Sequence, residues 1–393
     1  MSDGSAYAPH SELPLLTPSG ERAGQAPTSD ICGMDYTDWR STYFVEVGDG
    51  TAYVYVNVAG DVEPAEALTA SEAIGYGALI SVLAGRRNDF DALLAWYDAH
   101  QNDNGLMCWQ QVRREGVIQT NPHFGDNSAT DGDMDMALAL LLAADAWGHA
   151  ARYKARGARV STALLANCVC PDTGVLGLGD WALRGGRDNP YYFIARPSDF
   201  LFDHMARFAA DLDPAWRHVA DACHRVLVEQ VTQHSPCGLV ADFVRYNEAR
   251  RGYEPVVGGV LERPSDGDFS YNACRLPWRL TLSPQARVRG LLDGMFAFFD
   301  ARMRACDVKD GRGIVLAATY SMSGEPTCGY THMAMLASIW CMFHTRGARA
   351  EADRLRAAMA WLREVGGGGY YGDTLAVLAR LQISAEPYEM CVL

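Results

Sequence analysis

Apolar residues recur at helical spacing along most of the chain, and this pattern predicts an all-α protein. Judged by spacings of three and four residues and by end signals, about twelve segments have the pattern of helices. They lie near residues 30–43, 71–84, 88–101, 131–148, 150–168, 198–211, 214–232, 270–282, 285–303, 328–345, 349–365 and 370–382. Several adjacent segments are joined by only a few residues, which favours antiparallel helical hairpins.

The hairpins are separated by long irregular stretches, a pattern typical of a closed ring of six paired helices. These stretches lie at 44–70, 102–130, 169–197, 233–269 and 304–327. No repeat of about 34 residues accompanies them, so an open solenoid is not expected. Short strands are expected at 53–58 and 238–244. We predict a single domain over residues 29–393.

The segment 1–28 is rich in Ser, Pro and Gly, and we predict a flexible arm there. It contains no apolar stretch of the kind found in signal peptides. No apolar run elsewhere is long enough to span a bilayer, so we expect no membrane partner. The location of the protein stays open between the cell interior and export with a leader that this numbering omits.

Charge and composition narrow the possible partners. The formal net charge is -14, from 48 acidic and 34 basic residues, which argues against a nucleic-acid partner and suits a neutral or cationic one. The 11 cysteines form no CxxC pair, and the 10 histidines are scattered without ligand spacing. We therefore predict no metal and no cofactor, and take a monomer as the default.

The long connections collect aromatic and acidic residues, and loops on a rigid scaffold are where binding groups usually lie. Because aromatic rings stack on the faces of sugar rings, this composition predicts a carbohydrate-binding surface. The residues concerned are Trp109, Trp181, Tyr191, Tyr192, Glu262, Asp266 and Asp268.

The densest chemical signal is a group of three aspartates at a predicted helix start, Asp131, Asp133 and Asp135. One interpretation is helix capping, since carboxylates accept hydrogen bonds from first-turn N–H groups. A calcium loop is excluded, because the required Gly and Glu are missing. The other interpretation is a functional carboxylate cluster, because Asp131 and Asp135 share a helix face. The residues alone leave capping and cluster open.

The helix that these aspartates begin resembles the signature of glycoside hydrolase family 8: Ala129-Thr130-Asp131-Gly132-Asp133, Met136-Ala137, Ala139-Leu140-Leu141, Ala143 and Trp147. Further segments match in family order: Thr69-Ala70-Ser71-Glu72-Ala73-Ile74-Gly75-Tyr76-Gly77, Leu178-Gly179-Asp180-Trp181, Arg196-Pro197-Ser198-Asp199 and Tyr271-Asn272-Ala273. The resemblance covers roughly residues 30–385. It implies an (α/α)6 barrel that hydrolyses a β-1,4-linked polysaccharide with inversion. One departure is Ala73-Ile74, where the family usually has Gly-Gln.

The resemblance also implies roles for individual residues. Glu72 would be the general acid, which must hold a proton at working pH and therefore needs a raised pKa. Asp131 would hold the sugar ring at the point of cleavage. Trp109, Trp181 and Tyr271 would bind sugar rings.

The assignment of the general base is less direct, because Asn272 stands where many family members have the catalytic Asp. A branch of the family with the same Asn uses a Glu about ten residues earlier, which implies Glu262 as the base and Asn272 as a residue that holds the attacking water. Asp266 and Asp268 are alternatives, as is an inactive protein. Arg275 is expected to pair with a carboxylate and fix its direction.

The substrate expectation follows from that branch, which the resemblance connects with chitosan, mixed-linkage β-glucan and cellulose. The surplus of acidic residues favours a polycation, so we expect an endo-acting chitosanase first, and a β-1,3-1,4-glucanase or an endo-β-1,4-glucanase second. Xylan is less expected. A non-catalytic glycan-binding protein and a polysaccharide lyase on the same barrel are the rivals from other classes.

Overall fold

The computed structural model describes residues 34–56, 66–123, 126–147, 150–306 and 316–384; the predicted arm at 1–28 lies outside them. The α-helices are α1 (Tyr36–Tyr43), α2 (Ser71–Leu83), α3 (Arg87–Ala99), α4 (Thr130–Ala146), α5 (Ala150–Asn167), α6 (Asp180–Leu183), α7 (Phe202–Asp211), α8 (Trp216–Glu229), α9 (Leu276–Thr281), α10 (Ala286–Arg289), α11 (Leu292–Ala305), α12 (Met333–Thr345), α13 (Arg349–Glu364) and α14 (Tyr370–Ile383). The strands are β1 (Phe44–Glu46), β2 (Ala52–Val54), β3 (Glu66–Ala70), β4 (Gln110–Arg114), β5 (Val117–Thr120), β6 (Ile194–Ala195), β7 (Val244–Asn247) and β8 (Gly252–Pro255).

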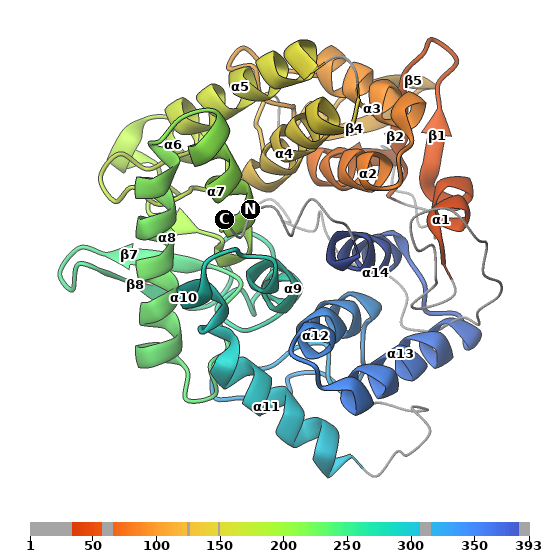
Figure 1. Ribbon diagram of the computed structural model, residues 1–393. Coiled ribbons are helices and arrows are strands. Elements are labelled where there is room, and N and C mark those ends of the chain that lie inside the picture. The colour runs from red at the N-terminus through yellow and green to blue at the C-terminus, as the bar shows by residue number, and fades with distance from the viewer. Residues whose placement is uncertain (1–33, 57–65, 124–125, 148–149, 307–315, 385–393) are drawn as a thin grey trace.

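The helices form two concentric rings (Figure 1). Helices α2, α4, α7, α9, α12 and α14 make the inner ring, and each packs against a partner in the outer ring: α3, α5, α8, α11, α13 and α1. The last pair joins the two ends of the described chain, because α1 packs on α14 and so closes the ring. The fold is the predicted (α/α)6 barrel with a few short strands.

The two rings differ in the way their sequences bury apolar groups. Every residue of α12 from Met333 to Phe343 is buried, as expected for a helix with protein on all sides. The outer helix α8 instead buries one stripe at spacings of three and four, which includes Val219, Cys223 and Val226. The apolar periodicity therefore places each helix in its layer.

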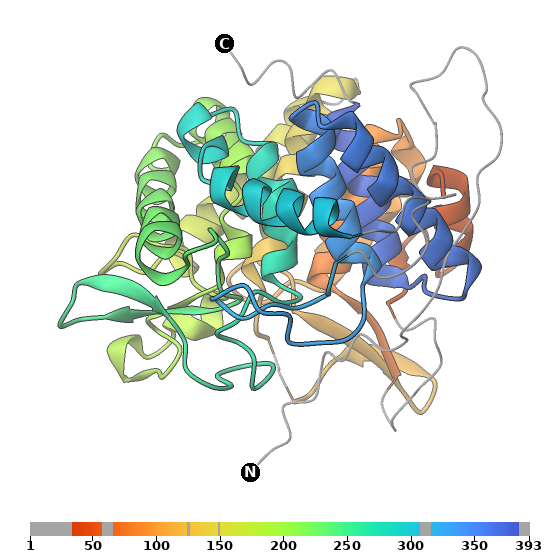
Figure 2. The same cartoon turned by 90° about the horizontal axis from the view of Figure 1, so that it is seen from below.

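Within the described ranges the strands form three small antiparallel sheets, with orders β1-β2, β3-β4-β5 and β6-β7-β8. Strands β4, β5, β7 and β8 gather with long connections at one end of the ring, the lower edge of Figure 2. Strand β3 runs directly into α2, so the N-terminal turn of α2, with Glu72, begins at the β3-β4-β5 sheet.

Some predicted elements differ from the structure. The expected helix 285–303 is two helices, α10 and α11, and the expected helix 198–211 begins only at Phe202, after a 3₁₀ turn over Pro197–Asp199. The expected strand 238–244 was wrong except at its last residue. The N–H groups of Asp242 and Phe243 donate to a neighbouring loop instead of a strand, at the carbonyls of Asp268 and Asp266.

Helices α2 and α4 cross at a pair of glycines, Gly75 and Gly132. A Cβ on Gly132 would lie 2.3 Å from the carbonyl carbon of Ser71 and 2.6 Å from the nitrogen of Glu72, both backbone atoms that cannot rotate away. A Cβ on Gly75 would lie 2.7 Å from the carbonyl oxygen of Gly132. The absence of side chains here sets the first turns of the two helices, with Glu72 and Asp131, against each other.

This crossing predicts the effect of a single methyl group. Gly132→Ala forces α2 and α4 apart and should destabilise the protein by about 2 kcal/mol or more, because overpacking against backbone cannot be relieved by a rotamer change. Thermal unfolding measures the loss. Gly290→Ala is the matched control, since its added Cβ would meet nothing closer than 3.5 Å. Equal melting temperatures for the two variants would contradict the interpretation.

Candidate active site

Glu72, the second residue of α2, is buried except for 14% of its side chain. Its Oε2 accepts a hydrogen bond from Nη1 of Arg275 at 3.1 Å, and its Oε1 accepts one from the hydroxyl of Tyr370 at 3.2 Å. Burial raises the pKa of Glu72 to about 7, since the attraction of Arg275 offsets only part of the desolvation and Asp131 adds repulsion. Glu72 thus keeps its proton to a higher pH than an ordinary glutamate does.

Asp131, in the first turn of α4, lies in the same network, but its pKa is shifted in the opposite direction from that of Glu72. Its Oδ2 accepts from Nη1 of Arg275 at 2.7 Å and from Nη1 of Arg196 at 3.3 Å. Burial alone would raise the pKa of Asp131, but the two guanidinium groups outweigh it and hold the pKa below the usual range. Two neighbouring carboxyl groups, Glu72 and Asp131, are thereby kept in different protonation states.

The other two aspartates of this helix start have different partners. Asp133 accepts from the hydroxyl of Tyr97 and from the backbone N–H of Met107, and burial raises its pKa to about 8. Asp135 pairs with Arg279 inside the barrel. The structure therefore brings only Asp131 to Glu72, and none of the three acts as the N-cap, which is Ala129.

Arg275 joins the parts of the network. Its side chain is 1% exposed, and besides Glu72 and Asp131 it donates from Nη2 to Oδ1 of Asp199 at 3.2 Å and to Oδ1 of Asn272 at 3.3 Å. A guanidinium has five N–H donors in a fixed plane, so one side chain can orient several acceptors at once. The predicted pairing of Arg275 with a carboxylate is present.

Glu262 reaches this network through Asn272. The side-chain N–H of Asn272 donates to Oε2 of Glu262 at 2.9 Å, while the amide oxygen accepts from Arg275. Because Arg275 can only donate, the amide must present its oxygen to Arg275 and its nitrogen to Glu262. The side chain of Glu262 is 24% exposed, and its Oε1 lies 3.8 Å from Nη2 of Arg196. Glu262 is therefore a carboxylate at the edge of the network with access to water.

The two alternative bases are placed differently. Asp266 is 1% exposed, and its carboxylate oxygens accept four backbone N–H groups of the loop before it. Within the described residues, the side chain of Asp268 has no hydrogen bond or ion pair to the network around Glu72. Of the three candidates, only Glu262 accepts a hydrogen bond from the side chain of Asn272.

The predicted sugar-binding aromatics differ in exposure and in their neighbours. Trp109 is half-buried, and its carbonyl accepts from the N–H of Ser71, directly before Glu72. Trp181 is half-buried in α6, and its ring packs edge-on against Tyr191 at 4.8 Å. Tyr271 is only 9% exposed. Its hydroxyl lies 2.8 Å from that of Tyr330, and the guanidinium of Arg263 covers its ring at 4.5 Å.

Sequence reasoning missed several residues of the network, among them Arg196, Asp199 and Tyr370. Arg196 contacts Asp131, Asp199 and Glu262. Burial raises the pKa of Asp199 to about 7, although Arg196 opposes the rise. The signal for the first two was the matching segment at 196–199, which was not assigned a role. Tyr370 follows the four glycines at 366–369 and is the first residue of α14.

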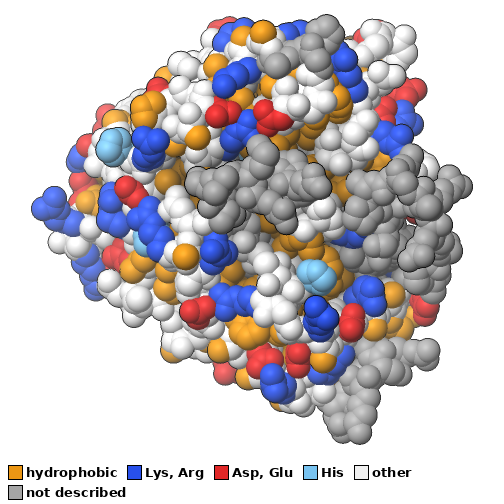
Figure 3. Space-filling view, viewed as in Figure 1, with side chains coloured by type: hydrophobic (Ala, Val, Ile, Leu, Met, Phe, Trp, Pro, Cys, Tyr) orange, Lys and Arg blue, Asp and Glu red, His pale blue; other side chains and the backbone are white. Residues whose placement is uncertain are grey.

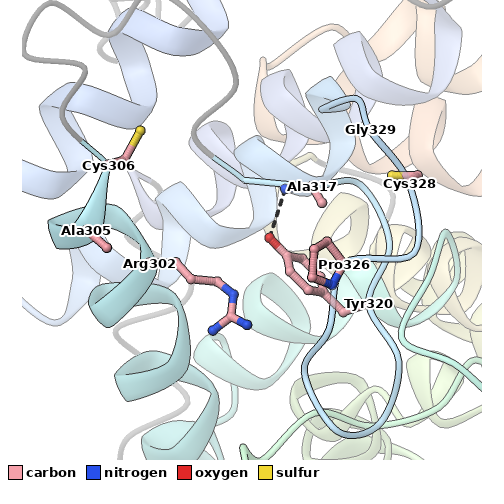
Figure 4. Close-up of a pocket in the computed structure, with 8 residues that line it drawn as sticks. All are labelled: Arg302, Ala305, Cys306, Ala317, Tyr320, Pro326, Cys328 and Gly329. Atoms are coloured by element: carbon pink, nitrogen blue, oxygen red, sulfur yellow. Dashed lines mark hydrogen bonds between the residues drawn. The ribbon is translucent and has the colours of Figure 1, made fainter.

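A separate pocket of about 380 Å³ lies between α11 and the loop before α12 (Figure 4). Arg302, Tyr320 and Cys328 are among the residues that line it, and none of the predicted site residues does. In the described part of the chain, no group of three or more His, Cys, Asp or Glu is arranged to hold a metal ion. No helix among the described residues is long and apolar enough to cross a membrane.

The raised pKa of Glu72 predicts a pH-dependent cost in stability. The pKa is about 7 in the folded state against 4.5 ordinarily, so the folded protein binds the proton more tightly than the unfolded chain. Stability relative to a Glu72→Gln variant should therefore fall as pH rises from about 4.5 to 7, by on the order of 2–3 kcal/mol. Denaturant unfolding at pH 5 and pH 8 measures this, with exposed Glu325→Gln as control. A pH-independent difference would contradict it.

Known proteins with similar sequences are glycoside hydrolases. The sequence model of Glycosyl hydrolases family 8 matches residues 26–384. A β-glucanase of Niallia circulans is 30% identical over 370 residues, which cover 89% of this chain and 83% of that protein. Endoglucanase A of Acetivibrio thermocellus is 26% identical over 375 residues, 94% of this chain and 72% of that one.

Solved structures of family 8 enzymes and of a β-glucanase have a similar fold. The apo structure of a β-1,3-1,4-glucanase from Paenibacillus sp. X4 superposes with a TM-score of 0.75 and 28% identity, and covers 89% of both chains. A cold-adapted family 8 xylanase has a TM-score of 0.68 at 18% identity, over 87% of this chain and 85% of that one, a likeness of fold alone. The protein is a glycoside hydrolase, and the chain belongs to glycosyl hydrolase family 8.

Proposed function

We propose that this protein is an endo-acting, inverting β-glucanase that cleaves mixed-linkage β-1,3-1,4-glucan or β-1,4-glucan. Glu72 is the general acid and Glu262 the general base. The observation that supports this most is the hydrogen bond from Asn272 to Glu262, because it connects a partly exposed carboxylate with the network around Glu72.

The acid step depends on the proton of Glu72. With a pKa of about 7, Glu72 can donate to the glycosidic oxygen as the bond to the anomeric carbon breaks. Once Glu72 is ionised, Arg275 and Tyr370 stabilise the carboxylate by the hydrogen bonds they already make. The leaving sugar departs with the proton.

The base step uses water on the opposite face of the sugar ring. Glu262 accepts a proton from this water while the water oxygen attacks the anomeric carbon. The attack inverts the configuration at that carbon. Asn272 cannot accept the proton, but its amide holds one oxygen of Glu262 and leaves the other for water. Asp131, kept ionised by Arg275 and Arg196, is suited to hold sugar hydroxyls and stabilise positive charge at the ring.

The choice of a neutral glucan over chitosan rests on the relatives and on local charge. The relatives named above are a β-glucanase, an endoglucanase and a β-1,3-1,4-glucanase. Glu72, Asp131 and Glu262 all face guanidinium groups of Arg275 or Arg196, and this positive charge offsets the attraction of the three carboxyl groups for a substrate ammonium. On one face of the molecule, basic side chains are interspersed with acidic ones (Figure 3), although the net charge is -14. Chitosanase activity, our first expectation, is therefore not favoured.

Substitution of the base tests both the chemistry and the substrate. Glu262→Gln keeps the shape of the side chain but cannot accept a proton, so we expect a fall in kcat of roughly 10³-fold or more. Reducing-sugar release is measured on barley β-glucan, carboxymethylcellulose, chitosan and xylan.

The outcomes separate the alternatives. Activity on the two glucans that disappears in Glu262→Gln supports the proposal. Wild-type activity confined to chitosan would restore the chitosanase interpretation. A folded wild-type protein that binds a glucan without cleaving any of the four polymers would instead be a glycan-binding protein.

The pH profile tests the acid. As pH rises through about 7, Glu72 loses its proton, so kcat/KM should fall on the alkaline side with a midpoint near that value. The hydrogen bond from Tyr370 stabilises the carboxylate of Glu72 and so lowers its pKa. Tyr370→Phe removes this bond, so the pKa of Glu72 should rise and the alkaline limb should move to higher pH. An alkaline limb that stays in place in this variant would show that another group controls it.

A further inference from the structure

The loop that carries Glu262 is folded around one buried carboxylate, that of Asp266. Oδ2 of Asp266 accepts backbone N–H groups from Val260 at 2.9 Å, Leu261 at 2.8 Å and Glu262 at 3.1 Å. Oδ1 accepts the N–H of Arg263 at 2.8 Å. A single rigid group thus fixes four consecutive peptides, and one of them belongs to Glu262.

The loop that carries Glu262 packs outside the main apolar core of the barrel. The carbonyl of Asp266 accepts from the N–H of Phe243 at 2.9 Å. Val260 and Leu261 pack at the edge of a small separate apolar cluster. The buried members of that cluster are Leu178, Ala182, Ile194, Phe243 and Val256. Few apolar contacts therefore hold the loop. Its shape comes mainly from polar contacts: the four bonds to the carboxylate, and backbone bonds from the N–H of Asp266 to the carbonyl of Arg263 at 3.2 Å and from the N–H of Asp268 to that of Ser265 at 2.8 Å.

We infer that Asp266 is a positioning residue for the reaction: its carboxylate shapes the loop and thereby sets Glu262 against Asn272. This rests on the proposed role of Glu262 as base. Bonds from N–H groups to an ionised acceptor are stronger than neutral ones, and loss of the acceptor would leave four N–H groups to find other partners. Asp266 itself is 1% exposed and contacts neither Glu72 nor Asp131 through any bond to its carboxylate, which the four loop N–H groups occupy.

The consequence is a loss of rate without a loss of binding. A displacement of a catalytic group by about 1 Å can lower the rate by about 100-fold. In Asp266→Ala all four bonds are lost, so we expect kcat to fall by about 100-fold while KM stays within about twofold. In Asp266→Asn one oxygen can still accept three N–H groups, but the amide N–H₂ faces the N–H of Arg263, so we expect a fall of about tenfold.

The experiment measures kcat and KM on barley β-glucan for both variants, together with Glu262→Gln and the control Asp213→Asn. Asp213 is exposed in the connection between α7 and α8, where its carboxylate accepts the backbone N–H of Ala215 at 2.8 Å, so it repeats the chemical change away from the network around Glu72. Asp213→Asn should keep wild-type kcat. The alkaline limb of the pH profile, which reports Glu72, should stay in place in Asp266→Ala, and circular dichroism checks that each variant is folded.

The possible results decide the inference. Folded Asp266→Ala with wild-type kcat, beside an inactive Glu262→Gln, would overturn it, as would a rise in KM at unchanged kcat. If Asp266→Ala does not fold, Asp266→Asn decides: a tenfold lower kcat at normal KM supports the inference, and wild-type kcat overturns it. Full activity of Glu262→Gln would instead show that the proposed base is wrong, and with it the premise.

Discussion

The guanidinium of Arg275 is the interaction on which the site depends. It is buried, and it donates to Glu72, Asp131, Asp199 and Asn272, which come from different parts of the ring. A buried charge is costly unless opposite charges and hydrogen bonds surround it. Two of the carboxyl groups that meet this need, those of Glu72 and Asp131, are also groups that the proposed chemistry uses, so the stability of the centre and its reactivity rest on one cation.

Arg275 also divides the protons among these groups. Asp131 receives two guanidinium groups and stays ionised, whereas Glu72 has a weaker share of Arg275, lies beside Asp131 and keeps a pKa of about 7. Burial acts on both residues in the same direction. The difference arises from the geometry around each carboxyl, and this is how one low-dielectric site can hold an acid and an anion together.

The base side of the site is built on another principle. Glu72 and Asp131 stand on inner helices that cross at Gly75 and Gly132, and the packing of the barrel fixes them. Glu262 stands on a loop, where shape must come from polar contacts because few apolar ones are available. Asp266 supplies those contacts. Asn272 joins the two parts, since its amide bonds to Arg275 on one side and to Glu262 on the other.

The sequence by itself determined the helices, their pairing and the segments around Glu72, Asp131 and Asn272, because apolar periodicity and short motifs are local. Helix ends such as Phe202 and the strands depended on partners elsewhere in the chain, so they were predicted poorly or missed. Only the tertiary structure decided that Arg196 joins Asp131 to Glu262, and that Asp133 and Asp135 turn to other partners. These contacts join segments far apart in sequence. The net charge gives the number of charged side chains but not their positions in space. Those positions determine the pKa values and which charges pair.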